Sequence, residues 1–171
     1  MRKIYFVLTH SGSLLSNVVR TYTRNEFSHV SISLDEELKE MYSFGRLHAY
    51  NPFLGGFVQE SPKFGTFKRF SNTNSKIYSF EVSEKQYYKI CKIVRKMMKE
   101  KKHYRFNFIG LIAVAMHLKI KRNKCFYCAE FIKYIVDNCD LQIKLPELVK
   151  PNDFENIEGS QVVYYGKLSE Y

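Results

Sequence analysis

Residues 27 to 34 read Phe-Ser-His-Val-Ser-Ile-Ser-Leu, and this alternation of apolar and small polar side chains constrains the fold more than any other feature. A period of two is typical of a β-strand with one buried face. The apolar members would pack into the core, whereas His29, Ser31 and Ser33 would line the opposite face. The pattern therefore predicts a histidine held on the rigid backbone of a core-anchored strand, as a general base must be.

Local sequence patterns divide the rest of the chain into strands and helices. Further strands are predicted over residues 3–8, 38–45, 56–60, 76–82 and 161–168. Helices are predicted over residues 14–23, 84–101, 106–118 and 128–138, with Ser83 as the N-cap of the second. We find no internal repeat or linker in the 171 residues, so the sequence predicts a single α+β domain spanning residues 1–171.

Residues 47–73 are rich in Gly, Pro, Asn, Phe and Lys, which predicts a long excursion around the short strand at 56–60. Such excursions often carry binding surfaces. Five phenylalanines could line a groove for an acyl or peptide substrate, or could instead seal the core under the loop: Phe53, Phe57, Phe64, Phe67 and Phe70.

Cys128 opens the predicted helix over residues 128–138. A thiol at a helix N-terminus lies near the positive end of the backbone dipole, which favours the thiolate and raises its nucleophilicity. A free cysteine is more often a small buried apolar side chain. Cys91, on the apolar stripe of the predicted helix over residues 84–101, is interpreted in that way.

A nucleophilic cysteine requires a base, and the chain has five histidines. They are His10, His29, His48, His103 and His117. Only His29 combines a strand-like setting with an ordered polar neighbourhood. Cys128 and His29 are therefore the predicted catalytic pair.

The segments Ser-His-Val-Ser-Ile at 28–32 and Phe-Tyr-Cys-Ala-Glu-Phe-Ile at 126–132 together resemble the permuted papain-like cysteine hydrolases, the YiiX-like branch of the NlpC-type superfamily. In that branch the histidine strand precedes the cysteine helix, as His29 precedes Cys128 here by 99 residues. The resemblance covers roughly residues 1–140. It implies a circularly permuted papain-like fold, in which an antiparallel sheet packs against helices and the cysteine lies at a helix N-terminus.

The resemblance also implies a third polar residue that orients the imidazole, on the strand after the histidine. A hairpin centred on Glu36 would place Ser43 opposite His29, although a hydroxyl stabilises an imidazolium less well than a carboxylate does. A one-residue slip in register would bring in Tyr42 instead. Glu60, at the end of the next predicted strand, is the nearest carboxylate, so these three candidates stay open.

The function implied is that of a cysteine hydrolase or acyltransferase, in which the Cys128 thiolate attacks an amide, ester or thioester carbonyl. Its substrate would be an acyl, peptide or lipid-linked molecule, and the substrate-binding residues cannot be named from sequence. No cofactor is implied. The alternative is a non-catalytic module on the same fold that binds lipid, peptide or nucleic acid. An ordinary thiol pKa at Cys128 would favour this module over the enzyme.

Basic residues outnumber acidic ones, with 27 Lys and Arg against 17 Asp and Glu and a net charge of +10. Lysines cluster on the predicted helix over residues 84–101 and again at 119–124. Solvated lysines are the default interpretation, and an anionic surface is a candidate partner. No nucleic-acid motif is recognisable.

Four cysteines could form two disulfides in a secreted protein. However, the apolar run at residues 4–8 is too short for the core of a signal peptide, so a cytoplasmic protein with reduced thiols is expected. A zinc site is a weaker alternative, because its ligands lack a second closely spaced pair. Those ligands would be Cys125, Cys128, His117 and Cys139.

Overall fold

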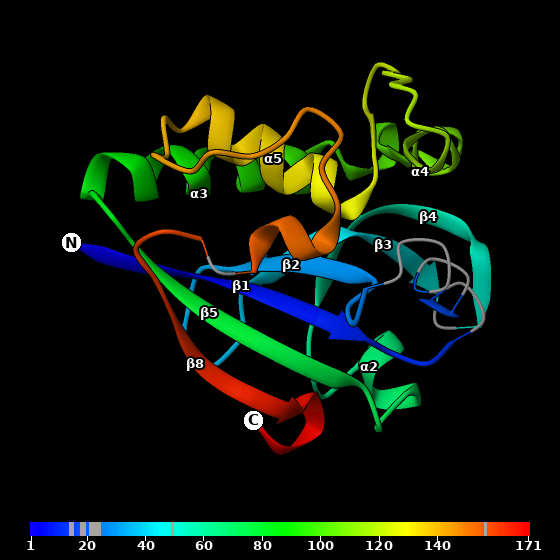
Figure 1. Ribbon diagram of the computed structural model, residues 1–171, viewed down its shortest axis with the longest axis horizontal. Helices are drawn as coiled ribbons and strands as arrows, with labels where there is room; N and C mark the ends of the chain where they lie inside the picture. Colours follow the sequence, from blue (N-terminus) through cyan, green and yellow to red (C-terminus); the bar gives the residue numbers. More distant parts are fainter. Residues whose placement is uncertain (14–15, 18–19, 21–24, 49, 156) are drawn as a thin grey trace.

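A six-stranded sheet forms the centre of the molecule, in the order β4-β3-β2-β1-β5-β8 (Figure 1). The computed structural model describes residues 1–171 apart from residues 14–15, 18–19, 21–24, 49 and 156. Each strand pairs antiparallel with its neighbours. The strands are β1 (Arg2–His10), β2 (His29–Ser33), β3 (Met41–His48), β4 (Asn51–Glu60), β5 (Asn74–Val82) and β8 (Ser160–Lys167).

Helices cover both faces of this sheet. Figure 1 shows α3 (Glu84–Lys99) and α5 (Cys128–Asn138) over one face, with α4 (Phe108–Ala115) beyond them, while the short α2 (Gly65–Arg69) lies on the other side. The strands β6 (Arg105–Phe106) and β7 (Cys125–Phe126) form a small parallel pair. Three 3₁₀ helices complete the described elements: η1 (Lys101–His103), η2 (Pro151–Phe154) and η3 (Leu168–Glu170).

The side chains of β1 alternate between two hydrophobic clusters. Phe6 belongs to the larger cluster, which joins the sheet to α3 and α5, and it is fully buried. Val7 belongs to a smaller cluster that includes Phe67 of α2 and Leu168 of η3. The central strand is therefore buried on both faces, as its nearly continuous apolar sequence requires.

An aromatic cluster ties the sheet to α5 and β7. The ring of Phe44 on β3 lies 5.1 Å from that of Phe126 and 5.5 Å from those of Phe57 and Phe131, measured between centroids. Tilted aromatic pairs at these distances add to the free energy gained by burial. Because Phe131 is on the helix that begins at Cys128, this cluster fixes the position of the cysteine relative to the sheet.

The structure confirms the predicted α+β class and most of the predicted elements. The helix predicted over 128–138 coincides with α5, and Ser83 forms a capping box with Gln86 at the start of α3. The helix predicted over 106–118 is shorter in the structure than predicted, where α4 spans Phe108–Ala115. The helix predicted over 14–23 lies largely outside the described residues.

The predicted long excursion was wrong, because β4 runs from Asn51 to Glu60. This strand lies at an edge of the sheet, where proline near the strand start is tolerated. Gly55 is required for packing rather than for a turn: a Cβ atom there would lie 2.5 Å from the Cβ of Phe106. The glycines thus allow the neighbouring segment to approach the strand, and the loop after β4 instead contains α2.

The predicted hairpin register was also wrong. The observed pairs are Ile32 with Tyr42 and Ser33 with Met41, which moves the turn one residue along the chain. The Asp35 carboxylate accepts hydrogen bonds from the backbone N–H of Lys39 at 3.0 Å and of Glu40 at 2.5 Å. These two bonds stabilise a turn that is longer than the predicted one. The face of each side chain is unchanged, because the partner of each β2 residue moves by two positions.

Replacing Phe44 with alanine should lower the free energy of unfolding by about 3–5 kcal/mol, because it removes the centre of the aromatic cluster. Phe64→Ala provides the control, since that ring is 68 % exposed and its loss should cost less than about 0.5 kcal/mol. Urea denaturation followed by circular dichroism measures both. Equal losses in the two variants would contradict the packing described above.

Candidate functional site

The ends of three elements converge on one cavity. His29 begins β2, Cys128 begins α5 and Glu60 ends β4, and all three line a cavity of about 80 Å³. Its apolar wall includes Phe67 of α2 and Leu111 of α4. The structure therefore brings the two sequence-predicted residues together, with a carboxylate beside them.

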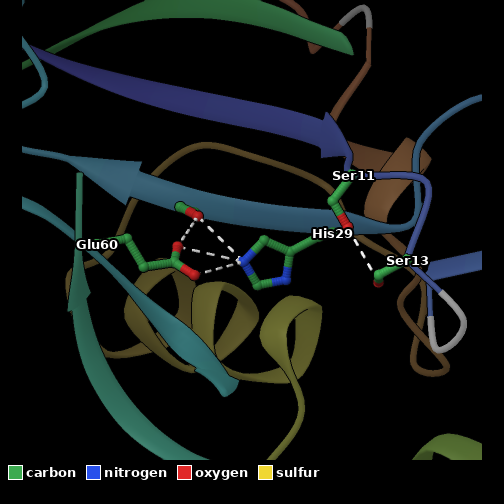
Figure 2. A network of polar contacts seen from close by, with 5 residues as sticks. Ser11, Ser13, His29 and Glu60 are labelled. Carbon is green, nitrogen blue, oxygen red and sulfur yellow. Dashed lines mark hydrogen bonds and ion pairs between the residues drawn. The ribbon is translucent and has the colours of Figure 1, made fainter. Parts of the chain in front are cut away.

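Glu60 holds the imidazole of His29 through one of its two nitrogens. His29 Nε2 lies 3.1 Å from Oε1 and 3.2 Å from Oε2 of Glu60. Figure 2 draws both contacts as dashed lines. The Ser31 hydroxyl donates to Glu60 Oε2 at 2.5 Å and lies 3.3 Å from His29 Nε2. Because Nε2 is occupied in this way, Nδ1 is the nitrogen left to exchange a proton with another group.

The electrostatics of the pair favour an imidazolium and a carboxylate. Burial alone would lower the pKa of His29, but the negative charge of Glu60 and the hydrogen bond to Cys128 raise that pKa to about 10. Burial alone would raise the pKa of Glu60, but the His29 charge and the hydrogen bond from Ser31 lower it. The side chains are 21 % and 10 % exposed, so solvent screens the ion pair only weakly.

Cys128 is the first residue of α5 and is only 4 % exposed. The helix begins there because Tyr127 is extended and its N–H donates to the Glu130 carboxylate at 3.4 Å. The Tyr127 hydroxyl anchors the same turn by donating to the Val149 carbonyl at 3.0 Å. The thiol is free, lies at the N-terminus of α5 and lines the same cavity as His29.

Of the three candidates for the orienting residue, Glu60 is the one that contacts His29. The Ser43 hydroxyl is buried near the Glu60 carboxylate and helps to lower its pKa, but it has no partner at full hydrogen-bonding geometry within the described residues. Tyr42 lies in the core, where its ring stacks on Phe57 at 6.1 Å. The resemblance led us to expect this residue on the strand after the histidine, whereas Glu60 is one strand further along.

A polar wall that was not predicted from the sequence lines the other side of the cavity. Ser11 and Ser13 lie away from Glu60, on the far side of the imidazole, in Figure 2. The Arg46 guanidinium donates to the Ser13 hydroxyl and also lines the cavity. Burial and the nearby Arg69 lower the pKa of Arg46. No sequence signal separates Arg46 from the many other basic residues.

The predicted phenylalanine groove is present only in part. Phe67 lines the cavity, and its ring lies 6.4 Å from that of His29. Phe57 belongs to the core, Phe64 is exposed, and Phe70 lies beneath the guanidinium of Arg46 at 5.4 Å. The side chain of Phe53 lies outside the described part.

The remaining cysteines do not join the site. Cys125 is buried and free, and it lines a different cavity, which Tyr127 also lines. Among the described residues, no three His, Cys, Asp or Glu side chains are grouped so that they could hold a metal ion. The zinc alternative therefore has no ligand set there, and its histidine, His117, is exposed.

No known family model and no curated protein matches this chain. Within the described residues, no helix is long and apolar enough to cross a membrane. The chemistry of the site must therefore be inferred from its geometry and from the properties of the residues that line it.

The His29 ring should remain protonated at pH 8, because its pKa is raised to about 10. Proton NMR titration of the ring should show this directly. In Glu60→Gln the pKa should fall toward or below the ordinary value of about 6.5, since burial then opposes the charge. Ser43→Ala is the matched control and should leave the titration of His29 nearly unchanged. A large shift in that variant would contradict Glu60 as the residue that raises the pKa of His29.

The same pair should make stability depend on pH. The folded-state pKa of His29 lies above its unfolded value of 6.5, so its stabilising contribution is complete below about pH 6.5 and is lost as pH rises toward 10. The pKa of Glu60 is lowered, so its contribution is lost as pH falls through the acidic range. Chemical denaturation across this range should show a bell-shaped difference between the native chain and Glu60→Gln, and a flat difference would contradict the pairing.

Proposed function

We propose that this protein is a cysteine-dependent hydrolase or acyltransferase. Cys128 is the nucleophile and His29 is the general acid and base. Glu60 orients the His29 ring and stabilises its protonated form. The observation that carries the proposal is the contact of His29 Nε2 with Glu60 at 3.1 Å in a cavity that also contains the Cys128 thiol. A nucleophile, a base and an orienting carboxylate in this order are typical of acyl transfer.

The first step is attack by the Cys128 thiolate on an acyl carbonyl carbon. The imidazolium of His29 stabilises the thiolate, as does the N-terminus of α5. A C–S bond forms as the carbonyl π electrons move to oxygen. The backbone N–H of Cys128, in the first turn of α5, donates to this oxyanion.

The second step is collapse of the tetrahedral intermediate. The carbonyl re-forms, the bond to the leaving group breaks, and His29 gives its proton to the departing amine, alcohol or thiol. Neutral His29 then takes a proton from water or from an acceptor molecule. The deprotonated water or acceptor attacks the thioester carbonyl, and the C–S bond breaks to release the Cys128 thiolate. Glu60 keeps the ring in position and stabilises its charge throughout both half-reactions.

The arrangement of elements supports a permuted papain-like fold. The helix that begins at Cys128 packs against an antiparallel sheet that presents His29, and the histidine strand comes first along the chain. All four cysteines are buried and free, which suits a reducing compartment such as the cytoplasm. The phenylalanine and leucine side chains of the cavity suit an acyl group, and Arg46 at its polar wall suits a polar or anionic substituent.

A panel of activated acyl esters and thioesters tests this function. The expected result is substrate turnover with an acyl adduct on Cys128, detected by mass spectrometry of the quenched protein. Cys128→Ala should abolish the adduct, and Glu60→Gln should reduce kcat/KM by about a hundred-fold or more, because the ring loses its orienting charge.

Cys125→Ala is the matched control, because this second buried thiol lies only three residues away. It should retain turnover and the adduct on Cys128. Acylation of Cys125, or equal acylation of all four cysteines, would contradict the proposed nucleophile. Reversible binding without any adduct would instead favour a non-catalytic module.

A further inference from the structure

Exposed apolar side chains cover α4 and the segment that follows it. Ile109, Ile112 and Met116 are spaced along one face of the helix and its C-cap, and they are 51 %, 63 % and 66 % exposed. Leu118 and Ile120, in the segment that follows the helix, are also exposed. We call these five residues the α4 patch. A grouping of large apolar side chains in solvent usually marks an interaction site.

Exposed basic residues alternate with the end of this patch. Lys119, Lys121, Arg122 and Lys124 all lie in the exposed segment between α4 and β7. Lys119 pairs with Glu147 and Lys124 with Glu100. Lys121 and Arg122 form no ion pair within the described part of the chain, so their charges are available to a partner.

The fold presents this segment to the outside. The backbone N–H of Leu118 donates to the Ala113 carbonyl at 2.8 Å, which folds the segment back against the end of α4. In Figure 1 the chain between α4 and α5 extends beyond the layer of helices. Apolar and basic side chains are thus displayed together on one projecting part of the molecule.

We propose that the α4 patch docks the protein on an anionic lipid bilayer. The apolar side chains would enter the boundary between headgroups and acyl chains, while the adjacent Lys121 and Arg122 would contact anionic headgroups. The net charge of +10 adds attraction to such a surface. A helix of eight residues is about 12 Å long and cannot span a bilayer, so α4 would lie in the interface.

Helix α4 lies between the proposed docking surface and the cavity of the candidate site. Phe108 and Leu111 of the same helix line the cavity that contains Cys128 and His29. A bilayer against the exposed face of α4 would therefore lie beside that cavity. Docking itself does not depend on the proposed chemistry and can be measured without it.

Vesicle flotation with Cys128→Ala protein tests the docking separately from catalysis. We expect binding to vesicles of phosphatidylcholine and phosphatidylserine, weaker binding to phosphatidylcholine alone, and a loss of binding at high salt. The double variant Ile112→Glu/Met116→Glu should reduce binding about ten-fold or more. Lys121→Glu/Arg122→Glu should reduce binding to the anionic vesicles by a similar factor.

Two control variants distinguish binding through the α4 patch from non-specific hydrophobic binding and from non-specific electrostatic binding. Val162→Glu/Val163→Glu alters exposed apolar residues on the edge strand β8. Lys92→Glu/Lys96→Glu alters the exposed basic face of α3. Both should change binding by less than the corresponding α4 variants, with folding checked by thermal denaturation.

Three results would overturn the proposal. The first is no binding to anionic vesicles. The second is an equal loss of binding in the control and the α4 variants. The third is self-association of the native chain that Ile112→Glu/Met116→Glu abolishes, without any vesicle binding, because the patch would then be an interface between copies of this chain.

Discussion

The ion pair between Glu60 and His29 is the interaction on which the arrangement of the site depends. A carboxylate with so little exposure must be paired, because an isolated buried charge is strongly destabilising. Glu60 reaches the histidine because β4 stays paired with β3 as far as its last residue, where Glu60 lies opposite Met41. Gly45 leaves room for it, since a Cβ atom there would lie 3.0 Å from Glu60 Oε1. The pair in turn fixes which imidazole nitrogen is free to interact with Cys128.

The local parts of the site could be predicted from the sequence because short patterns determine them. The alternation around His29 specifies its strand and its face, and the start of α5 at Cys128 follows from an aromatic run that gives way to helical spacing. The choice among Ser43, Tyr42 and Glu60 could not be made, because it depends on the register of one hairpin and on the length of an edge strand. The Asp35 side chain holds the turn of that hairpin, and the edge strand passes close to Phe106 at Gly55.

The other side of the cavity could not be predicted for a different reason. Ser11 and Arg46, which line it, come from segments far apart in the chain, and nothing in their local sequence marks them. The extent of the predicted helix over 106–118 was also misjudged, because its apolar composition does not reveal which residues are buried. In the structure α4 has two roles: part of it lines the cavity, and Ile109 and Ile112 face solvent.

The central proposal is that His29 and Glu60 make Cys128 a reactive nucleophile, and the most direct test is the rate of Cys128 alkylation as a function of pH. A small electrophile with mass-spectrometric mapping measures this rate in the native chain, in His29→Ala and in Glu60→Gln. The account predicts that Cys128 is labelled faster in the native chain than in either variant at neutral pH. Labelling that increases only near the ordinary thiol range of about 8.5, and is the same in all three proteins, would contradict it.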